Sequence, residues 1–244
     1  PGWGFDADVG FFKRLTLVPA ALKAVRDPQG RTLREVLPAD VHARWLPLKQ
    51  RYLGNDRGVE KDRPMAAGSE LLRKALREHR LGRRPIITPV IEEASRKAGL
   101  VITSTRVSVR IENPRAVLKQ ARGVTVDDTA CFSALLDKVE HEMPMMVERA
   151  NAWAVGDVGA LQALAGNDAG EVCIGALEQT SFGRAHDLAG LQTRARTAWL
   201  AAARASLLKH LQTFASVPME MLVGKDGVLA QLEREGYAIE APPQ

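Results

Sequence analysis

Apolar side chains recur every three to four residues along most of this 244-residue chain, and this spacing constrains the fold more than any other feature. It is typical of helices that bury one face against a core. The clearest examples fall in the ranges 41–52, 71–76, 135–150 and 188–211. Glycines and prolines separate these stretches, as expected where helices start and stop. We therefore predict a helix-rich fold.

Local signals indicate where several helices begin or break. Thr32 and Glu35 have the spacing of a capping box, so we expect a helical turn to begin there. Pro64 is well placed to open another helix at its first position. Pro47 and Pro144 instead fall inside predicted helices, where the missing N–H should kink or split them.

Strand signals are fewer. Residues 106–111 alternate polar and apolar side chains, which predicts a half-buried strand. Near the C-terminus we expect strands at 213–217 and 237–240, separated by a loop at 218–227 and a helix at 228–235. A strand, helix and strand this close together favour a right-handed parallel crossover. Such units bind ligands in the loop after the first strand.

Together these patterns predict an α/β fold, and more closely a helix-rich α+β arrangement with a small mixed sheet and a large helical block at about 125–210. We expect a single domain over residues 1–244. Residues 1–30 are expected to form a poorly patterned N-terminal segment of that domain, and residues 213–240 its terminal strand-loop-helix-strand unit.

Composition and charge argue against several classes of protein. Aromatic residues make up 5% of the chain, so its core must rest on leucine, valine and alanine. The net charge of +5 comes from scattered arginines without zinc-finger or basic-zipper spacing, so we expect no nucleic-acid partner. We also expect no membrane span, because no apolar run is long enough, and no signal peptide is recognisable. The chain begins at Pro1 without a methionine, so we expect a processed or trimmed product.

The chain contains two cysteines, Cys131 and Cys173, on separate predicted helices. They could be two buried free thiols, as in many cytosolic proteins. They could also form one disulfide closing a loop of about forty residues. We favour the disulfide, which implies an oxidising compartment and hence a periplasmic or exported protein. Reduced cysteines would instead indicate a cytoplasmic one.

Few residues have the spacing that catalysis or metal binding requires. Asp137 and His141 lie four residues apart and are a candidate metal pair, but a solvated helix face is the simpler interpretation. Arg63 and Arg194 are candidate anion-binding residues, with ordinary surface or salt-bridging roles as the alternative.

The loop 219–227 contains Gly224 and Gly227 and precedes a predicted helix. Its backbone amides could hold an anion at the helix N-terminus. It could equally be a plain connection whose turns require the two glycines. Its spacing alone does not decide between these interpretations.

Several segments match the pattern of a known family. Residues 214–217, 219–229 and 234–237 resemble the C-terminal signature of the TraB/GumN family. That signature is a strand, a small-residue turn, His-Leu-x-Gly-x-x-Gly, a helix and a closing Arg-x-Gly-Tyr strand. Residues 59–64 resemble the family's Arg-Pro helix start, and residues 152–157 resemble its helix break before a Gly-Asp cap.

The resemblance implies a metal site, because the family is similar to the Tiki proteins, which are metal-dependent peptidases. Its presumed ligands are a Gly-x-x-His near the N-terminus, a glutamate and the C-terminal histidine. Here Met221 stands at the histidine position, and Ser104 and Thr105 stand where the family often has Leu-Glu. The Gly-x-x-His is absent from these residues. A thioether is a poor ligand for zinc or manganese, so the resemblance predicts a family scaffold without the family's divalent metal.

The loop that would carry the family site still has its glycines. One carboxylate, Glu220, lies beside Met221, but a single carboxylate does not build a metal site. The candidate residues of this family-site loop are Glu220, Met221, Gly224, Asp226 and Gly227.

Three functions are compatible with these observations. The favoured one is a catalytically degenerate family member that binds or scaffolds in the cell envelope, with no cofactor in this chain. The second is a metal-dependent peptidase or hydrolase completed by an unseen N-terminal segment or a partner chain. The third is an anion- or small-molecule-binding domain centred on residues 219–227 with Arg63 or Arg194. The partner would be a protein or small molecule, and a homo-oligomer is also considered.

Overall fold

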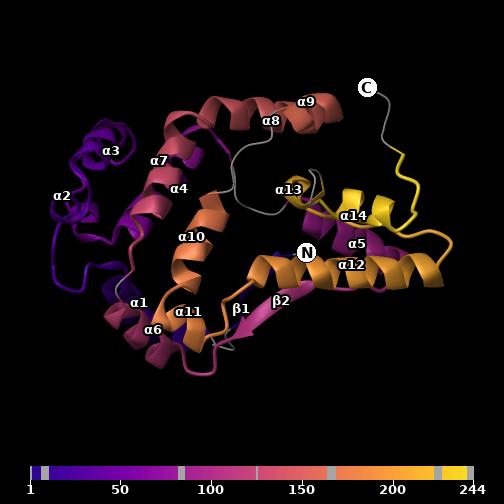
Figure 1. Cartoon of the computed structure of the whole chain (residues 1–244), viewed down its shortest axis with the longest axis horizontal. Coiled ribbons are helices and arrows are strands. Elements are labelled where there is room, and N and C mark those ends of the chain that lie inside the picture. Colours follow the sequence, from indigo (N-terminus) through magenta and orange to yellow (C-terminus); the bar gives the residue numbers. More distant parts are fainter. Residues whose placement is uncertain are drawn as a thin grey trace. The chain divides into compact units, whose positions relative to one another are not determined.

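The structure is a computed structural model, and it describes residues 2–6, 11–81, 86–124, 126–163, 169–222 and 227–240. Helices dominate this part of the chain (Figure 1). In chain order the elements are β1 (Gly2–Asp6), α1 (Phe11–Val25), α2 (Leu33–Val36), α3 (Ala39–Tyr52), the 3-10 helix η1 (Val59–Lys61), α4 (Pro64–Glu78), α5 (Ile87–Ala98), β2 (Arg106–Arg110), α6 (Pro114–Gly123), α7 (Thr129–Glu140), α8 (Met143–Val155), α9 (Val158–Ala163), α10 (Ala169–Glu178), α11 (Ser181–Ala185), α12 (Leu191–Lys209), α13 (Met219–Leu222) and α14 (Val228–Arg234).

The chain divides into two compact units. Unit 1 comprises Pro1–Phe5, Gly82–Val109 and Gly190–Gln244, and unit 2 comprises Asp6–Leu81 and Arg110–Ala189.

Unit 2 is built around α7. Helices α3, α4 and α10 pack against α7, and α1 packs against α6. Trp45 of α3 and Phe132 of α7 are both fully buried, with ring centroids 5.5 Å apart. Gly68 allows α4 and α7 to approach closely, since a Cβ there would lie 2.9 Å from Leu135 Cδ1. The buried side chains of this core are Leu33, Leu37, Val41, Trp45, Val59, Ala67, Leu71, Ala75, Phe132, Leu136, Val139 and Met143.

Unit 1 has a smaller core between α12 and α14. Its buried side chains are Trp199, Leu200, Val228 and Leu232. Partly buried apolar side chains complete this cluster, which we call the α12–α14 cluster; they are Ala203, Val217, Met221, Leu222 and Tyr237.

The helical predictions with local start signals are confirmed. Glu35 accepts hydrogen bonds from the backbone N–H (2.6 Å) and the hydroxyl (2.8 Å) of Thr32, as the capping-box spacing predicts. Pro64 opens α4 at its first turn. The helix predicted across Pro144 is split at residues 141–142, and Pro144 lies in the first turn of α8, whereas α3 runs through Pro47 without interruption.

The prediction of a small mixed sheet is not confirmed. Strand β2 forms at 106–110 as expected, and it pairs with β1. The predicted strands at 213–217 and 237–240 are wrong, because neither range has regular secondary structure. Without those strands, the described residues do not form the predicted parallel crossover.

The physical reason is that a strand needs a neighbouring strand to pair its backbone groups. Residues 213–216 are exposed and have no such neighbour among the described elements. Val217 and Tyr237 instead pack as irregular chain against the α12–α14 cluster. A short helix, α13, also occupies the start of the predicted loop.

The N-terminal segment differs from its prediction as well. Residues 1–30 are poorly patterned in sequence, but α1 occupies Phe11–Val25. Beyond α1, Asp27 and Gly30 form a turn in which the N–H of Gly30 donates to the carbonyl of Asp27 at 3.1 Å. This turn leads into α2 and forms one wall of a pocket.

Candidate functional site

The predicted site residues fall in different parts of the fold. Met221 lies in α13, and Gly227 is the N-cap of α14. Arg194 lies in α12 of unit 1, whereas Arg63 is the N-cap of α4 in unit 2. Gly224, Asp226 and the side chain of Glu220 lie outside the described residues.

Met221 is a packing residue in this fold. Its side chain is partly buried against the α12–α14 cluster, whose buried members are aliphatic side chains and Trp199. Its backbone N–H donates to the carbonyl of Pro218 at 3.0 Å, which closes the first turn of α13. Methionine suits such a position, because its flexible thioether fills irregular gaps and contacts aromatic rings favourably.

These residues do not fit the divalent metal that the resemblance implies. A hydrolytic zinc or manganese site needs several imidazole or carboxylate ligands around one open position. Met221 offers a thioether among apolar groups. Ser104 and Thr105, at the other expected ligand position, offer hydroxyl groups, and Ser104 Oγ lies 3.5 Å from the N–H of Arg106.

A different group of potential metal ligands lies on α7. Asp137, Glu140 and His141 each offer a donor atom, and these atoms lie within 4.8 Å of one another. Arg44 of α3 occupies the carboxylates, however, with its Nη2 2.5 Å from both Asp137 and Glu140. Hydrogen bonds to Glu140, and then to Asp137, raise the pKa of Arg44. Asp137 and Glu140 therefore form an ion-pair network between α7 and α3, whereas the simpler interpretation of the sequence is a solvated helix face.

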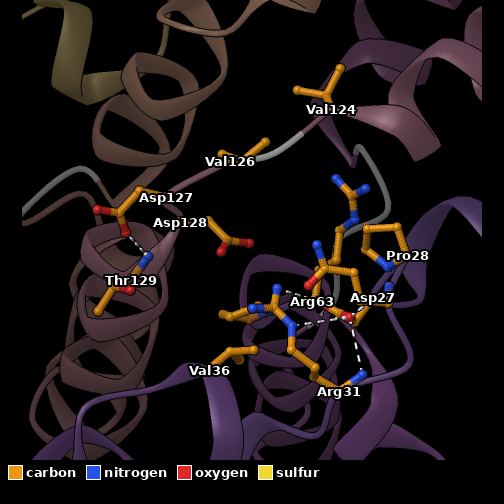
Figure 2. A pocket seen from close by; sticks show the side chains of 12 residues that line it. Asp27, Pro28, Arg31, Val36, Arg63, Val124, Val126, Asp127, Asp128 and Thr129 are labelled. Carbon is orange, nitrogen blue, oxygen red and sulfur yellow. Dashed lines mark hydrogen bonds and ion pairs between the residues drawn. The ribbon is translucent and has the colours of Figure 1, made fainter.

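A pocket of about 150 Å³ lies within unit 2 (Figure 2). Three segments far apart in the sequence form it: the turn after α1 with helix α2, the start of α4, and the segment before α7. Its lining residues are Asp27, Pro28, Gln29, Arg31, Val36, Arg63, Pro64, Val124, Val126, Asp127, Asp128 and Thr129. It combines two guanidinium groups and three carboxylates with apolar walls.

Arg63 ties two of these segments together. Its Nη2 donates to the carbonyl of Arg122 at 2.7 Å, and its Nε to that of Arg26 at 3.4 Å. Burial lowers the pKa of Arg63, against the opposing effect of the nearby charges on Asp128 and Asp27. Two nitrogen atoms of the Arg63 guanidinium thus donate to backbone carbonyl groups. These bonds give Arg63 a structural role, whether or not it also binds a ligand.

Asp128 is the buried carboxylate of the pocket. It is 6% exposed, and its Oδ2 accepts a hydrogen bond from the backbone N–H of Met65 at 2.8 Å. Burial raises the pKa of Asp128, although the bond from Met65 and the charge of Arg63 act in the opposite direction. Asp128 is also the N-cap residue of α7, where its side chain makes no capping hydrogen bond, and its bond to Met65 links the starts of α4 and α7.

Asp27 and Arg31 form the second charged pair. The Asp27 carboxylate lies 3.0 Å from Arg31 Nη2 and accepts backbone hydrogen bonds from Gln29 (2.9 Å) and Arg31 (3.1 Å). Burial acts to raise the pKa of Asp27, but the hydrogen bonds from Arg31 and Gln29 outweigh it and lower this pKa. Neither Asp27 nor Arg31 was predicted as a site residue. The Asp-Pro-x-Gly sequence from Asp27 to Gly30 signals the turn, but not the pocket beside it.

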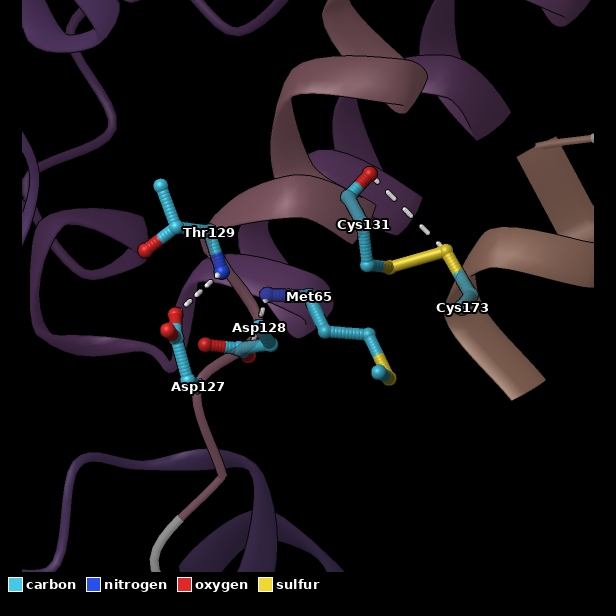
Figure 3. Close-up of a disulfide and its surroundings, with 6 residues drawn as sticks. All are labelled: Met65, Asp127, Asp128, Thr129, Cys131 and Cys173. Atoms are coloured by element: carbon cyan, nitrogen blue, oxygen red, sulfur yellow. Dashed lines mark hydrogen bonds between the residues drawn. A yellow bond between two sulfur atoms is a disulfide. The ribbon is translucent and has the colours of Figure 1, made fainter. Parts of the chain in front are cut away.

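Cys131 and Cys173 form a disulfide with an S–S distance of 2.05 Å and Cα atoms 4.5 Å apart (Figure 3). The bond joins α7 to α10 beside the core of unit 2. The structure therefore has the disulfide that we favoured over two free thiols. Among the described residues, no helix is long and apolar enough to cross a membrane.

Comparison with known proteins identifies the family. The TraB/PrgY/gumN family matches residues 12–241, which is nearly the whole chain. No curated protein and no solved structure matches the chain. Because the match spans both compact units, it does not depend on the C-terminal motif alone. The chain belongs to the TraB/PrgY/gumN family.

Proposed function

We propose that this chain is a catalytically degenerate member of its family, which binds or scaffolds another molecule in the cell envelope without metal-dependent hydrolysis. The observation that carries the proposal is the position of Met221. Met221 stands where the family signature has its histidine, and its thioether side chain packs, partly buried, against the apolar α12–α14 cluster. Ser104 and Thr105 supply no carboxylate at a second expected ligand position.

The disulfide supports an envelope location. Disulfides form and persist in oxidising compartments such as the bacterial periplasm. Cys131 is fully buried at one end of the bond, and its partner Cys173 lies across from it on α10. We propose that the protein is periplasmic or exported. Because the family match covers both units, we also propose that they act together as one family domain.

Peptide hydrolysis tests the proposal. The purified chain is incubated with an unstructured peptide library and Mn²⁺ or Zn²⁺, with and without a chelator, and the products are measured by mass spectrometry. We expect no cleavage that the chelator abolishes. Chelator-sensitive cleavage by this chain would contradict the proposal.

The same assay on the full-length protein addresses the alternative of a hydrolase completed by an N-terminal segment or a partner chain. We expect the full-length protein to be inactive as well. Activity that appears only in the full-length protein or with a partner chain added would favour the alternative.

A second candidate function is the binding of an anion or small molecule, and the partly buried guanidinium of Arg63 favours it, against the opposing charge of the three carboxylates in the same pocket. Arg31 and Arg63 both line this pocket, and burial weakens the solvation of Arg63. A desolvated guanidinium binds anionic oxygens more strongly than an exposed one. The predicted roles of Arg194 and of residues 219–227 in anion binding remain separate proposals, because those residues belong to unit 1.

Calorimetric titration with inorganic phosphate and with acetate tests this second function. We expect Arg63→Ala to weaken binding at least about tenfold, equivalent to about 1.4 kcal/mol. Arg34→Ala is the matched control, because Arg34 is an exposed arginine of α2 outside the pocket lining. Equal affinities for the wild type and Arg63→Ala would remove this candidate.

A further inference from the structure

Helix α5 has an apolar face whose side chains are all exposed or only partly buried. None of its twelve residues is buried. Ile87, Val90, Ile91, Ala94 and Ala98 recur at the helical spacing that places side chains on one face. The residues that flank α5 in the sequence include further aliphatic side chains with large exposed fractions; these are Ile86 (73%), Leu100 (69%), Val101 (94%) and Ile102 (51%).

The end of α5 is well defined by its own sequence. Gly99 adopts a left-handed conformation with φ of +64°, and its N–H donates to the carbonyl of Arg96. The N–H of Leu100 donates to the carbonyl of Ser95 at 2.9 Å. These two bonds form a Schellman motif, which ends the helix and turns Leu100 back toward its last turn.

Such a helix needs a partner to be stable. Isolated helices of about twelve residues are marginal in water, and most helices in proteins are stabilised by packing of an apolar face. Helix α4 shows the ordinary solution in this chain, since its apolar residues Leu71 and Ala75 are fully buried. The face of α5 has the same pattern without the burial.

The charges beside this face indicate which partner it fits. Glu93 and Lys97 lie four residues apart, so they share one edge of the helix next to Val90 and Ala94. The opposite edge carries Thr88, Glu92 and Ser95 without a basic residue. Within one helix, Glu93 pairs with Arg96 at 2.7 Å and with Lys97 at 3.4 Å, and these side chains are largely exposed.

An antiparallel pair of α5 helices makes use of this arrangement. In an antiparallel pair, the same edge of both helices faces its counterpart, so Glu93 of each copy faces Lys97 of the other. In a parallel pair, the edge with Glu93 and Lys97 would instead face the opposite edge of the second helix, which has no basic residue. A symmetric contact of this kind buries the same patch on both copies.

A membrane surface fits less well. Helices that bind membranes carry an excess of lysine and arginine on their polar face. The polar residues of α5 include Glu92 and Glu93 as well as Arg96 and Lys97, so the helix has no net charge.

We propose that α5 is a self-association site, through which two copies of this chain pair their α5 helices in antiparallel orientation with Glu93 opposite the Lys97 of the second copy. The proposal does not rest on the function proposed above. The contact is small, so we expect reversible dimers of the transient class.

Sedimentation of the full chain over a concentration series tests self-association. We expect a monomer–dimer equilibrium in the wild type. Val90→Lys should abolish the dimer, while it retains helical circular dichroism because lysine is a good helix former. Leu208→Lys is the matched control, because Leu208 is 85% exposed on α12. A wild type that stays monomeric, or a Val90→Lys variant that dimerises like the wild type, would overturn the proposal.

Charge reversal tests the antiparallel geometry. Glu93→Lys and Lys97→Glu each place like charges opposite each other, so each should raise the dimer dissociation constant at least about tenfold. An equimolar mixture of these two variants should form heterodimers, because lysines of one copy then face glutamates of the other. The Glu93–Lys97 pair within one helix is absent from both variants. Recovery of dimer formation in the mixture therefore reports a contact between two chains. No recovery would overturn the antiparallel pairing.

Flotation with vesicles that contain anionic lipid tests the alternative that the apolar face of α5 binds a membrane surface. We expect the wild type to stay unbound at physiological salt. Binding by a monomeric wild type that is lost in Val90→Lys would assign the face of α5 to a membrane and would contradict the proposal.

Discussion

At the scale of single residues, our proposal that the family's metal chemistry is lost rests mainly on Met221. A histidine at this position would place a polar ring against the α12–α14 cluster unless a metal or a hydrogen-bond partner satisfied it. Methionine removes that requirement and contributes apolar surface instead. Under our proposal, Met221 therefore has a packing role where the family signature has its histidine.

This packing role predicts the effect of substitutions at Met221. Met221→Leu should change the free energy of unfolding by less than about 1.5 kcal/mol, because volume-conserving apolar exchanges are tolerated. Met221→Ala should cost about 1–2 kcal/mol, since the side chain is only partly buried. Met221→His should cost about 1–3 kcal/mol for its unsatisfied polar nitrogen. Urea unfolding measures all three, and a Met221→His variant as stable as the wild type would contradict the role.

Asp128 gives a prediction about pH. Burial raises the pKa of Asp128 in the folded state, so the folded protein holds this proton more tightly than the unfolded chain. The resulting stabilisation is present below the unfolded pKa and is lost as pH rises through the folded pKa. Asp128→Asn keeps an acceptor for Met65 and removes the titration, so it should gain stability relative to the wild type as pH rises through that window.

Denaturant unfolding of both proteins between about pH 3 and pH 7 checks this, because the window begins near the ordinary aspartate pKa. Asp137→Asn is a suitable control, because its carboxylate is exposed and faces Arg44 instead of the pocket. The stability gain of Asp128→Asn over the wild type should grow with pH. A gain that is constant with pH, or that falls as pH rises, would show that burial does not dominate the pKa of Asp128.

At the scale of elements, close approach of α4 and α7 sets the geometry of unit 2. Both helices contribute to the pocket at their N-terminal ends, through Arg63 and Asp128. The approach depends on Gly68, because a Cβ there would lie 2.9 Å from Leu135 Cδ1 and 3.0 Å from Phe132 Cδ2. Both of these neighbouring side chains are buried.

Gly68→Ala should therefore destabilise the protein by about 1–3 kcal/mol through overpacking, which exceeds the helix-propensity gain of about 1 kcal/mol. Gly175→Ala is the matched control in α10, where a Cβ would meet nothing within 4 Å. It should be neutral or stabilise by about 0.5–1 kcal/mol. Thermal unfolding with the disulfide intact compares the two, and equal effects would contradict close packing at Gly68.

The disulfide between α7 and α10 also stabilises the arrangement of the helices in unit 2. Cys131 and Cys173 are separated by 42 positions, so the bond restricts the unfolded chain strongly. Replacing both cysteines with serine should lower the free energy of unfolding by about 3–4 kcal/mol in the chain-entropy model. The comparison is made by urea unfolding without reductant. Reductant should lower the stability of the wild type and leave the double variant unchanged, and an equal response of both would contradict the bond's contribution.

At the scale of the whole molecule, the sequence predicts local features far better than those assembled from distant segments. The starts of α2 and α4 follow from Thr32 and Pro64, because caps and first-turn prolines act within one helical turn. The predicted strands at 213–217 and 237–240 fail because a strand depends on a partner elsewhere.

The site shows the same distinction. The exchange of histidine for methionine at position 221 is visible in the motif, but the apolar cluster around it is not. The pocket joins Asp27, Arg63 and Asp128 from three segments that only tertiary packing brings together. Arg63 alone among these was predicted as a candidate binding residue, as a possible anion-binding arginine. The sequence favoured a Cys131–Cys173 bond because no other cysteine is available.

The central claim is that this chain keeps the scaffold of its family without the family's metal. Metal analysis of the full-length protein, purified natively and equilibrated with Mn²⁺ and Zn²⁺ before desalting, tests it most directly. The claim predicts much less than one divalent ion per chain, with no change in thermal stability on adding a chelator. One tightly held ion per chain that a chelator removes, with a fall in stability on its removal, would contradict it.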